Sequence, residues 1–159
     1  MVTKHTLIAL VEDKPGVLNK VASLFRRRGF NIESITVGKT ETPGISRMTI
    51  VVGGTGGAVE QVRKHLDKLV DVIKVSDITG SRALGRELAL IKVKATPQTR
   101  GEIIQIASIF KGDIIDVSED SMIIEITGDE GKIDSFIELL KGHGIKEMVR
   151  TGKVVITRG

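Results

Sequence analysis

The segment VEDKPGVLNKVASLF, residues 11–25, decides the fold of the first half of the chain. An apolar run ends at Glu12 and Asp13, Pro15 and Gly16 follow, and an amphipathic pattern begins at once. Proline suits the first turn of a helix, because the N–H that it lacks has no partner there. Glycine costs helix stability, up to about 1 kcal/mol in a helix interior. The segment therefore predicts a strand followed by a helix, and it raises the question of what the chain gains from a bare backbone at the helix start.

Composition narrows the class of protein. The chain has 159 residues, of which 40% are hydrophobic and 28% charged, as is typical of a globular protein with one ordinary domain or two small ones. It contains no cysteine, which excludes a disulfide framework, a thiol nucleophile and a cysteine metal site, and fits a reducing cytoplasm. No apolar run approaches the roughly 20 residues of a membrane span, and the N-terminus carries no cleavable signal pattern. The net charge of +4 weakly favours anionic partners. We therefore expect a cytoplasmic protein that does not enter a membrane.

Hydrophobic periodicity predicts the same order of elements in each half of the chain. In the first half the predicted elements are a strand at 4–12, a helix at 15–28, strands at 31–39 and 45–52, a helix at 58–70 and a strand at 72–79. In the second half they are a strand at 86–95, a helix at 99–110, strands at 112–118 and 121–128, a helix at 130–142 and terminal strands at 145–150 and 153–158. The order β-α-β-β-α-β is that of the ferredoxin-like unit. The fold class is therefore α+β, with two tandem ferredoxin-like βαββαβ domains at 1–79 and 87–159 and a linker at 80–86.

Each predicted helix of the first half has one apolar face, as 3.6-residue spacing requires. On the helix at 15–28 this face holds Val17, Leu18, Val21, Ala22 and Phe25. On the helix at 58–70 it holds Val59, Val62, Leu66 and Leu69. Gly29 is a natural stop for the first helix.

The start of the first helix is the strongest candidate for a binding site. A helix N-terminus carries free N–H groups and a partial positive charge, so it binds carboxylates and phosphates. Gly16 removes the side chain that would block a ligand there, and Asp13 can accept a hydrogen bond from an ammonium group. The pattern suits an α-amino acid. A second interpretation needs no ligand: Asp13 caps the helix, Pro15 begins it and Gly16 allows close packing. The local pattern leaves both open.

The other motifs favour structural roles. The GGTGG segment at 53–57 matches no phosphate-binding pattern and indicates a flexible turn from strand to helix. The three arginines at 26–28 fall in the last turn of a predicted helix, where cations offset the helix dipole. RNA-recognition modules of this topology stack bases on aromatic side chains of their strands. No predicted strand here carries one, because the phenylalanines lie on helices or before a strand: Phe25, Phe110, Phe136 and Phe30. We therefore expect no nucleic-acid partner.

No residues have the spacing of a catalytic or metal site. The three histidines, His5, His65 and His143, are far apart in the sequence. An acidic stretch lacks the spacing and the glycine of an EF-hand loop, and indicates a solvated turn; its members are Asp113, Asp116, Glu119 and Asp120. We therefore expect no catalytic residue and no metal ligand in this chain.

The segment VEDKPGVLNKVASLFRRRGFNIES, residues 11–34, resembles the amino-acid-binding ACT domain. The similarity extends over nearly the whole chain, from about residue 3 to the end. RRGFNIESITV, ISRMTIVV, LVDVIKV and FKGDIIDVSEDSMIIEITG together resemble the regulatory, or small, subunit of acetohydroxyacid synthase, which is also called acetolactate synthase. The Asp-x-Pro-Gly motif is common to ACT domains in general, whereas the strand segments are much more specific to this family.

The resemblance implies a subunit with no catalytic activity and no cofactor of its own. Its partner is the catalytic subunit, a transferase that condenses two 2-oxo acids in the biosynthesis of valine, leucine and isoleucine. That partner is expected to hold thiamine diphosphate, Mg²⁺ and FAD. The small subunit raises the partner's activity and confers feedback inhibition, usually by valine.

The resemblance also implies where the effector binds. Two ACT domains pair side by side in a homodimer, and the effector lies between them. Gly16 and Val17 offer backbone N–H groups to its carboxylate, Asp13 and Asn31 hold its polar groups, and Leu18 and Ile32 flank its aliphatic side chain. One subunit supplies the loop from Asp13 to Leu18, and the other supplies the start of the second strand. The expected effector-binding residues are Asp13, Lys14, Pro15, Gly16, Val17, Leu18, Asn31 and Ile32.

Two alternatives stay open on the sequence. A free-standing ACT-type sensor of another enzyme shares the first half but does not need the second. Valine-responsive relatives often carry asparagine where this chain has Asp13, so the resemblance leaves the choice among branched-chain amino acids open.

Overall fold

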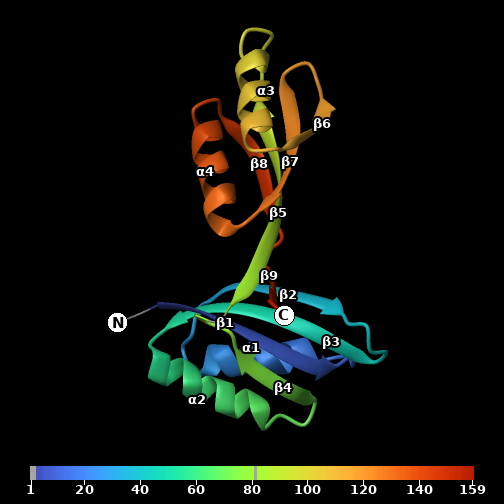
Figure 1. Cartoon of the computed structure of the whole chain (residues 1–159), viewed down its shortest axis with the longest axis vertical. Coiled ribbons are helices and arrows are strands. Elements are labelled where there is room, and N and C mark those ends of the chain that lie inside the picture. The colour runs from blue at the N-terminus through green and yellow to red at the C-terminus, as the bar shows by residue number, and fades with distance from the viewer. Residues whose placement is uncertain (1–2, 81) are drawn as a thin grey trace. The chain divides into compact units, whose positions relative to one another are not determined.

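The computed structural model describes residues 3–80 and 82–159, which form two compact units (Figure 1). The first unit runs to Leu84 and also includes Lys153–Gly159, and the second is Gly85–Gly152. Residues 1, 2 and 81, the last inside the predicted linker at 80–86, lie outside the described residues.

The first unit has the predicted β-α-β-β-α-β order. Its elements are β1 (Thr3–Glu12), α1 (Val17–Arg27), β2 (Ile32–Lys39), β3 (Ile45–Gly54), α2 (Gly56–Asp67) and β4 (Val72–Asp77). The four strands form an antiparallel sheet in the order β2-β3-β1-β4. β1 therefore lies in the middle of the sheet, and β2 and β4 are its edges.

The second unit repeats this order. Its elements are β5 (Ala83–Lys94), α3 (Arg100–Ile109), β6 (Asp113–Val117), β7 (Ser121–Gly128), α4 (Glu130–Lys141) and β8 (Ile145–Arg150), and the terminal strand β9 (Val154–Thr157) follows. The strand order β6-β7-β5-β8 corresponds to that of the first sheet. The expected α+β class with two tandem ferredoxin-like units is confirmed. Among the described residues, no helix is long and apolar enough to cross a membrane.

Helix α1 begins two residues later than predicted, because Gly16 is not helical. Gly16 has φ 85° and ψ −10°, in the left-handed region, and it is the N-cap residue of α1. The end of α1 agrees with the prediction at Gly29. That glycine has φ 74°, its N–H donates to Arg26 O at 3.1 Å, and the next N–H, of Phe30, donates to Phe25 O at 3.0 Å.

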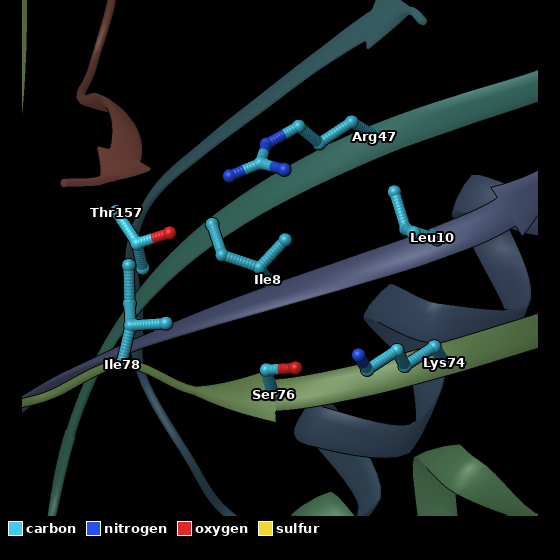
Figure 2. Close-up of a pocket in the computed structure, with 7 residues that line it drawn as sticks. All are labelled: Ile8, Leu10, Arg47, Lys74, Ser76, Ile78 and Thr157. Carbon is cyan, nitrogen blue, oxygen red and sulfur yellow. The ribbon is translucent and has the colours of Figure 1, made fainter. Parts of the chain in front are cut away.

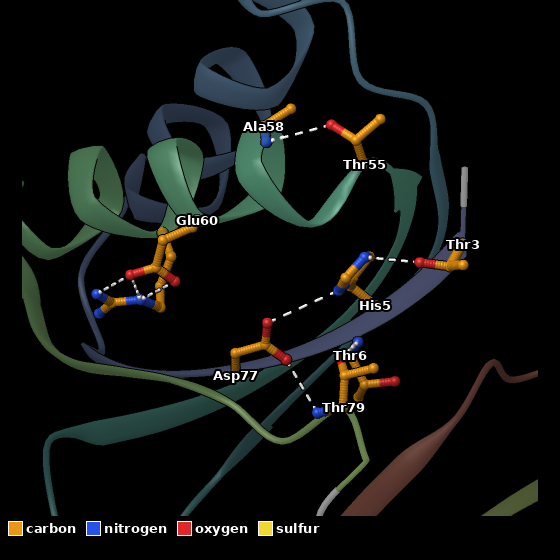
Figure 3. Close-up of polar contacts among 9 residues, drawn as sticks. Thr3, His5, Thr6, Thr55, Ala58, Glu60, Asp77 and Thr79 are labelled. Atoms are coloured by element: carbon orange, nitrogen blue, oxygen red, sulfur yellow. Dashed lines mark hydrogen bonds and ion pairs between the residues drawn. The ribbon is translucent and has the colours of Figure 1, made fainter. Parts of the chain in front are cut away.

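Helix α2 begins two residues earlier than predicted. β3 extends through Gly54, and the Thr55 hydroxyl accepts a hydrogen bond from the N–H of Ala58 at 3.3 Å (Figure 3). This is an ordinary helix N-cap. The GGTGG segment is therefore the end of a strand and the first turn of a capped helix, and the loop predicted there is shorter than expected.

The first core lies between the sheet and the two helices. Val17, Val21 and Phe25 are buried as predicted, and so are Val59, Val62 and Leu66 of α2. The prediction for Leu18 is wrong: 46% of its surface is exposed, and Leu24 is buried instead. The buried stripe follows positions 17, 21, 24 and 25, which leaves position 18 at its margin.

The second unit has a separate core. Fully buried Phe136 of α4 packs against Phe110, with ring centroids 5.3 Å apart. At the edge of this core, Arg150 donates to the buried Glu87 at 3.2 Å and to the exposed Asp134 at 2.7 Å. The predicted strands at 121–128 and 145–150 are found with these bounds.

The C-terminal strand packs on the first unit, which differs from the predicted boundary that assigned residues 87–159 to one domain. Val155 of β9 is buried in a small cluster with Ile8 and Ile78. The Arg47 guanidinium on β3 donates to Val155 O at 2.7 Å. The N–H of Arg158 donates to Arg82 O at 2.9 Å, where β9 pairs with the start of β5.

Candidate functional site

The loop between β1 and α1, which carries most of the predicted effector-binding residues, is exposed to solvent. Its residues from Asp13 to Gly16 are all exposed. A Cβ added at Gly16 would meet no atom within 4 Å, so space does not require glycine there. The left-handed φ of 85° does, because it strains any residue with a side chain. Gly16 therefore turns the chain into the helix and leaves the space in front of it empty.

The first turn of α1 has free donors. The N–H of Val17 donates to Lys14 O over a long 3.4 Å, and that of Lys20 donates to Gly16 O at 3.1 Å. No described residue accepts from the N–H groups of Leu18 and Asn19. The first turn carries no acidic residue to offset the positive end of the helix dipole. The donors available to an anion are thus the N–H groups of Gly16, Leu18 and Asn19. Of the two donors inferred from the sequence, that of Gly16 has no acceptor among the described residues, and that of Val17 makes the long bond to Lys14 O.

Asp13 does not cap the helix. The interpretation in which it does is wrong, because no side chain accepts a hydrogen bond from this helix start. Its own N–H donates to Gly44 O at 2.9 Å, which ties the loop to the β2–β3 turn. Its carboxylate forms no ion pair with any residue in the described ranges. The structure therefore leaves an exposed carboxylate without an ion pair in the loop that leads into the free N–H groups of α1.

The other charges around this loop are paired. Lys14 Nζ contacts Glu12 Oε2 at 2.8 Å, and this hydrogen bond raises the pKa of Lys14. Lys20 Nζ donates to Asp71 Oδ2 at 2.8 Å, and this hydrogen bond lowers the pKa of Asp71. Asp13 is thus the acid at the helix start that remains available for an external cation.

Asn31 and Ile32 lie at the other end of the sheet from this loop. Ile32 pairs with Val52, which pairs with His5 near the start of β1. Asp13 lies eight residues beyond His5, past the end of β1. At about 3.3 Å per strand residue, roughly 25 Å separate the two groups. Within one chain, the structure does not bring the two parts of the predicted site together.

A second copy of the chain removes this separation if it pairs along β2. β2 is an edge of the sheet, so one side of it has no neighbouring strand among the described residues. Antiparallel pairing of β2 with its copy puts Ile32 of one chain beside Lys39 of the other. The turn that follows Lys39 includes Gly44, whose carbonyl accepts the hydrogen bond from the N–H of Asp13. Such a pair brings Asn31 of one copy to the Asp13 loop of the other.

Exposed apolar side chains lie near these elements. Leu18 at the start of α1 is 46% exposed, and Val37 on β2 is 44% exposed. Ile32 is partly buried against the first core. Both exposed side chains suit an apolar contact with a ligand or a second copy.

The remaining sequence candidates have structural partners. Figure 3 shows His5 on β1 between Thr3 and Asp77: Nε2 is 2.9 Å from the Thr3 hydroxyl, and Nδ1 is 3.7 Å from Asp77 Oδ2. His65 is 2.6 Å from the Arg28 guanidinium, and His143 is 3.6 Å from Glu102. The part of the chain that the structure describes has no group of three potential metal ligands. The three arginines at 26–28 are exposed at the helix end.

Sequence reasoning missed two features of this site. The first is the left-handed conformation of Gly16. The sequence carried a signal for it, because a glycine directly before an amphipathic helix allows a left-handed N-cap residue as well as a small one. The second is the anchoring of Asp13 by Gly44, for which the sequence offers only the turn signal TETPG at 40–44.

Comparisons with known proteins agree on one family. Residues 7–74 match a family model described as the AHAS small subunit-like ACT domain, and residues 86–159 match one described as the small subunit of acetolactate synthase. The chain is 60% identical over 156 residues to a probable acetolactate synthase small subunit of Archaeoglobus fulgidus, with 98% of each chain covered. It is 50% identical over 157 residues to the acetolactate synthase small subunit of Bacillus subtilis, covering 98% of this chain and 91% of that one. The crystal structure of the acetolactate synthase small subunit from Thermotoga maritima superposes with a TM-score of 0.91 at 48% identity, over 99% of this chain and 98% of that chain.

Proposed function

The chain belongs to the small subunits of acetolactate synthase, and from this premise we propose that it is a non-catalytic subunit that senses a branched-chain amino acid and activates the catalytic subunit. Valine is the effector that we expect. The observation that carries the proposal is the open start of α1, where free N–H groups stand beside the unpaired carboxylate of Asp13.

The proposed complex satisfies both charges of an amino acid. The N–H groups of Leu18 and Asn19 donate to the effector carboxylate, which also faces the positive end of the α1 dipole. The Asp13 carboxylate accepts from the effector ammonium. The exposed side chain of Leu18 covers part of the aliphatic group. Lys14, Pro15, Gly16 and Val17 shape the loop around it.

The second half of the proposed site comes from a second copy. Pairing along β2 forms a homodimer in which Asn31 of one chain contributes a polar group and Ile32 an apolar one to the Asp13 loop of the other. The effector then contacts both copies, so its binding depends on how they are arranged.

This arrangement gives a physical basis for feedback inhibition. An effector shifts an equilibrium only if it binds the two states with different affinity. Here, the dimer arrangement that activates the catalytic subunit leaves the two halves of the site apart, and the effector stabilises the arrangement that closes them. A coupling free energy of about 1–3 kcal/mol is enough for a useful response.

The chemistry of acetolactate formation is assigned to the partner. Thiamine diphosphate, Mg²⁺ and FAD belong on the catalytic subunit in this proposal, and the present chain supplies no ligand to them. The absence of cysteine is consistent with action in the cytoplasm. A free-standing ACT-type sensor of another enzyme is the alternative, and the match of residues 86–159 to the small-subunit family favours the subunit of acetolactate synthase.

The test is a calorimetric titration of the full chain with valine, leucine and isoleucine, repeated on two variants. Asp13→Ala removes an exposed side chain that has no structural partner, so the protein folds as before but loses effector affinity by about tenfold or more. Glu41→Ala, in the nearby 40–44 turn, removes another exposed acid and leaves affinity unchanged. Equal binding by Asp13→Ala and the wild-type chain contradicts the proposed site.

Activation is measured separately, with the purified catalytic subunit. Adding the wild-type chain raises acetolactate formation, and valine reverses the increase. Asp13→Ala activates equally well but resists valine. If the wild-type chain leaves the rate of the catalytic subunit unchanged, the proposed activation is wrong, whatever the titration shows.

A further inference from the structure

The sheet of the first unit has a second face, on the side away from its helices. Leu7, Ala9 and Val11 alternate along β1 and are buried in the core between sheet and helices. Ile8 and Leu10 therefore point to the opposite face, because successive side chains of a strand alternate.

The pairing of β1 with β3 and β4 aligns side chains on this face in two rows, each with one residue from each strand. Leu10 pairs with Arg47 on β3 and with Lys74 on β4, so the first row is a leucine between two cations. Ile8 pairs with Thr49 on β3 and with Ser76 on β4, so the second row is an isoleucine between two hydroxyls. The face thus combines an aliphatic centre with donors on both sides.

These rows border a cavity of about 190 Å³, which is several times the space that one water molecule needs. Figure 2 shows its lining: Ile8 and Leu10 from β1, Arg47 from β3, Lys74 and Ser76 from β4, Ile78, and Thr157 from β9. None of these seven lining residues is acidic. The cavity offers two positive charges, two hydroxyls and three aliphatic side chains.

The positive charges of the cavity are not neutralised by the protein. Lys74 forms no ion pair with any residue that the structure describes. Arg47 donates to the neutral carbonyl of Val155 at 2.7 Å, which leaves its charge uncompensated.

The acids of this part of the sheet are paired with other groups. Glu12, which alternation along β1 places on the same face as Leu10, contacts Lys14 Nζ at 2.8 Å. Asp77 pairs in register with the buried Leu7, so it lies on the helix side, where its carboxylate faces His5 and accepts from the N–H of Thr79 (Figure 3). Asp71 is bound to Lys20.

We propose that this cavity binds a small aliphatic carboxylate without an ammonium group, such as a short branched 2-oxo acid. The backbones of β3 and β4 are about 10 Å apart across β1, since each strand spacing is about 4.8 Å, and both long side chains reach an anion held between them. Ile8, Leu10 and Ile78 contact the hydrocarbon part. A zwitterion is disfavoured, because the cavity has two cations and no carboxylate to accept its ammonium group.

The proposed ligand is therefore chemically distinct from that of the α1 start. There, Asp13 is available for an ammonium group and the donors are backbone N–H groups. Here, the donors are charged side chains on the opposite face of the same sheet. A chain with both sites reports on an amino acid and on a related acid that lacks the amino group.

The test is an NMR titration of the full chain with 3-methyl-2-oxobutanoate, which has the carbon skeleton of valine and a carbonyl in place of the ammonium group. Saturable shifts of the Ile8 and Ser76 amides are expected. Lys74→Gln keeps most of the side-chain stem and weakens binding by about tenfold, as loss of a charge-assisted contact requires. Lys68→Gln, an exposed lysine at the end of α2, is the matched control and binds as the wild type does.

Other outcomes overturn the proposal. These are an absence of saturable shifts, equal affinity in Lys74→Gln, or equally tight binding of inorganic phosphate, which has no aliphatic part. Asp13→Ala separates the two sites: it lowers valine affinity but leaves 2-oxo acid binding unchanged. Loss of 2-oxo acid binding in Asp13→Ala assigns that ligand to the α1 start and contradicts a site on the sheet face.

Discussion

The two units present the same loop, between their first strand and first helix, with different chemistry. In the first unit the loop ends on left-handed Gly16, and α1 has no acid in its first turn. In the second unit the N-cap residue of α3 is Thr99, with φ −101° and ψ −13°, and Glu102 lies in the first turn. Glu102 occupies the third helical position, which in α1 is held by Asn19.

The α3 loop is also tied to its own unit. The N–H of Thr96 donates to the Thr99 hydroxyl at 2.8 Å. The Arg100 guanidinium donates to the carbonyls of Ser118 and Glu119, at 3.2 Å and 3.0 Å. The start of α3 thus has a negative charge and hydrogen bonds within its own unit. The positive end of the α1 dipole has no such charge next to it. The shared topology does not make a binding site; the residues at one helix start do.

The largest expected effect tests whether the two units are separate at all. Each core is centred on one fully buried phenylalanine, Phe25 or Phe136. Replacement by alanine costs about 3–5 kcal/mol in the unit that contains it, because it removes buried area and leaves a cavity. Hydrogen exchange of Phe25→Ala should show lost protection in β1 and β3 with β5 and β7 unaffected, and Phe136→Ala should show the reverse. Loss of protection in both units from either variant contradicts two separately stable cores.

The second prediction gives the start of α1 the charge that the start of α3 has. Asn19→Glu gives α1 the first-turn acid that α3 already has. The new carboxylate favours the helix end, by about 0.3–1 kcal/mol, and repels the carboxylate of an amino acid. Calorimetry should therefore find valine affinity reduced by about tenfold together with an unchanged or higher melting temperature. Gln61→Glu, at an exposed position of α2, makes the same charge change and should leave binding intact.

The third effect contrasts two aspartates that precede helices. The Asp129 carboxylate accepts from the N–H of Lys132 at 2.8 Å and caps α4, whereas Asp13 caps nothing. Asp129→Ala should lower the free energy of unfolding of the second unit by about 1 kcal/mol. Asp13→Ala should leave the stability of the first unit unchanged. Denaturant titration measures both, and a destabilised Asp13→Ala indicates a structural role for that carboxylate.

The smallest effect concerns pH. The hydrogen bond from Lys20 holds the pKa of Asp71 below its ordinary value of 3.8, and the bond from Lys146 lowers that of Asp120 in the same way. A lowered folded-state pKa gives stability that is present above pH 3.8 and lost as the pH falls through the folded-state pKa. Asp71→Asn should flatten the acid dependence of stability in the first unit. Asp120→Asn should do so less in the second, because 75% of the Asp120 side chain is exposed against 12% for Asp71.

Most of the fold was predictable because its signals are local. The spacing of hydrophobic residues along the sequence predicts both the strands and the apolar helix faces. The strands at 121–128 and 145–150 are found with the predicted bounds. The helix starts were less accurate. At α1 a left-handed glycine delays the helix, and at α2 the hydroxyl of Thr55 starts it earlier, within a segment rich in glycine.

The long-range features were not predictable from pattern. Nothing local in VVIT at 154–157 indicates that Arg47 binds its backbone, so the last strand was assigned to the second domain. An open start of α1 was anticipated from Gly16, and the binding of an effector there stays a prediction. The resemblance already implied that Asn31 comes from a second copy, whereas the long distance between Asn31 and that loop within one chain follows only from the sheet register.

In the proposed dimer, two copies of the chain complete one effector site, and a complementation titration distinguishes this from a site within one copy. Asp13→Ala and Asn31→Ala, each alone, should bind valine about tenfold or more weakly than the wild-type chain by calorimetry. After mixing in equal amounts and allowing subunit exchange, half of the dimers are mixed and each has one intact site, so roughly a quarter of the wild-type capacity should return at wild-type affinity. If binding does not return in exchanged dimers, the site does not span two copies and the account is contradicted.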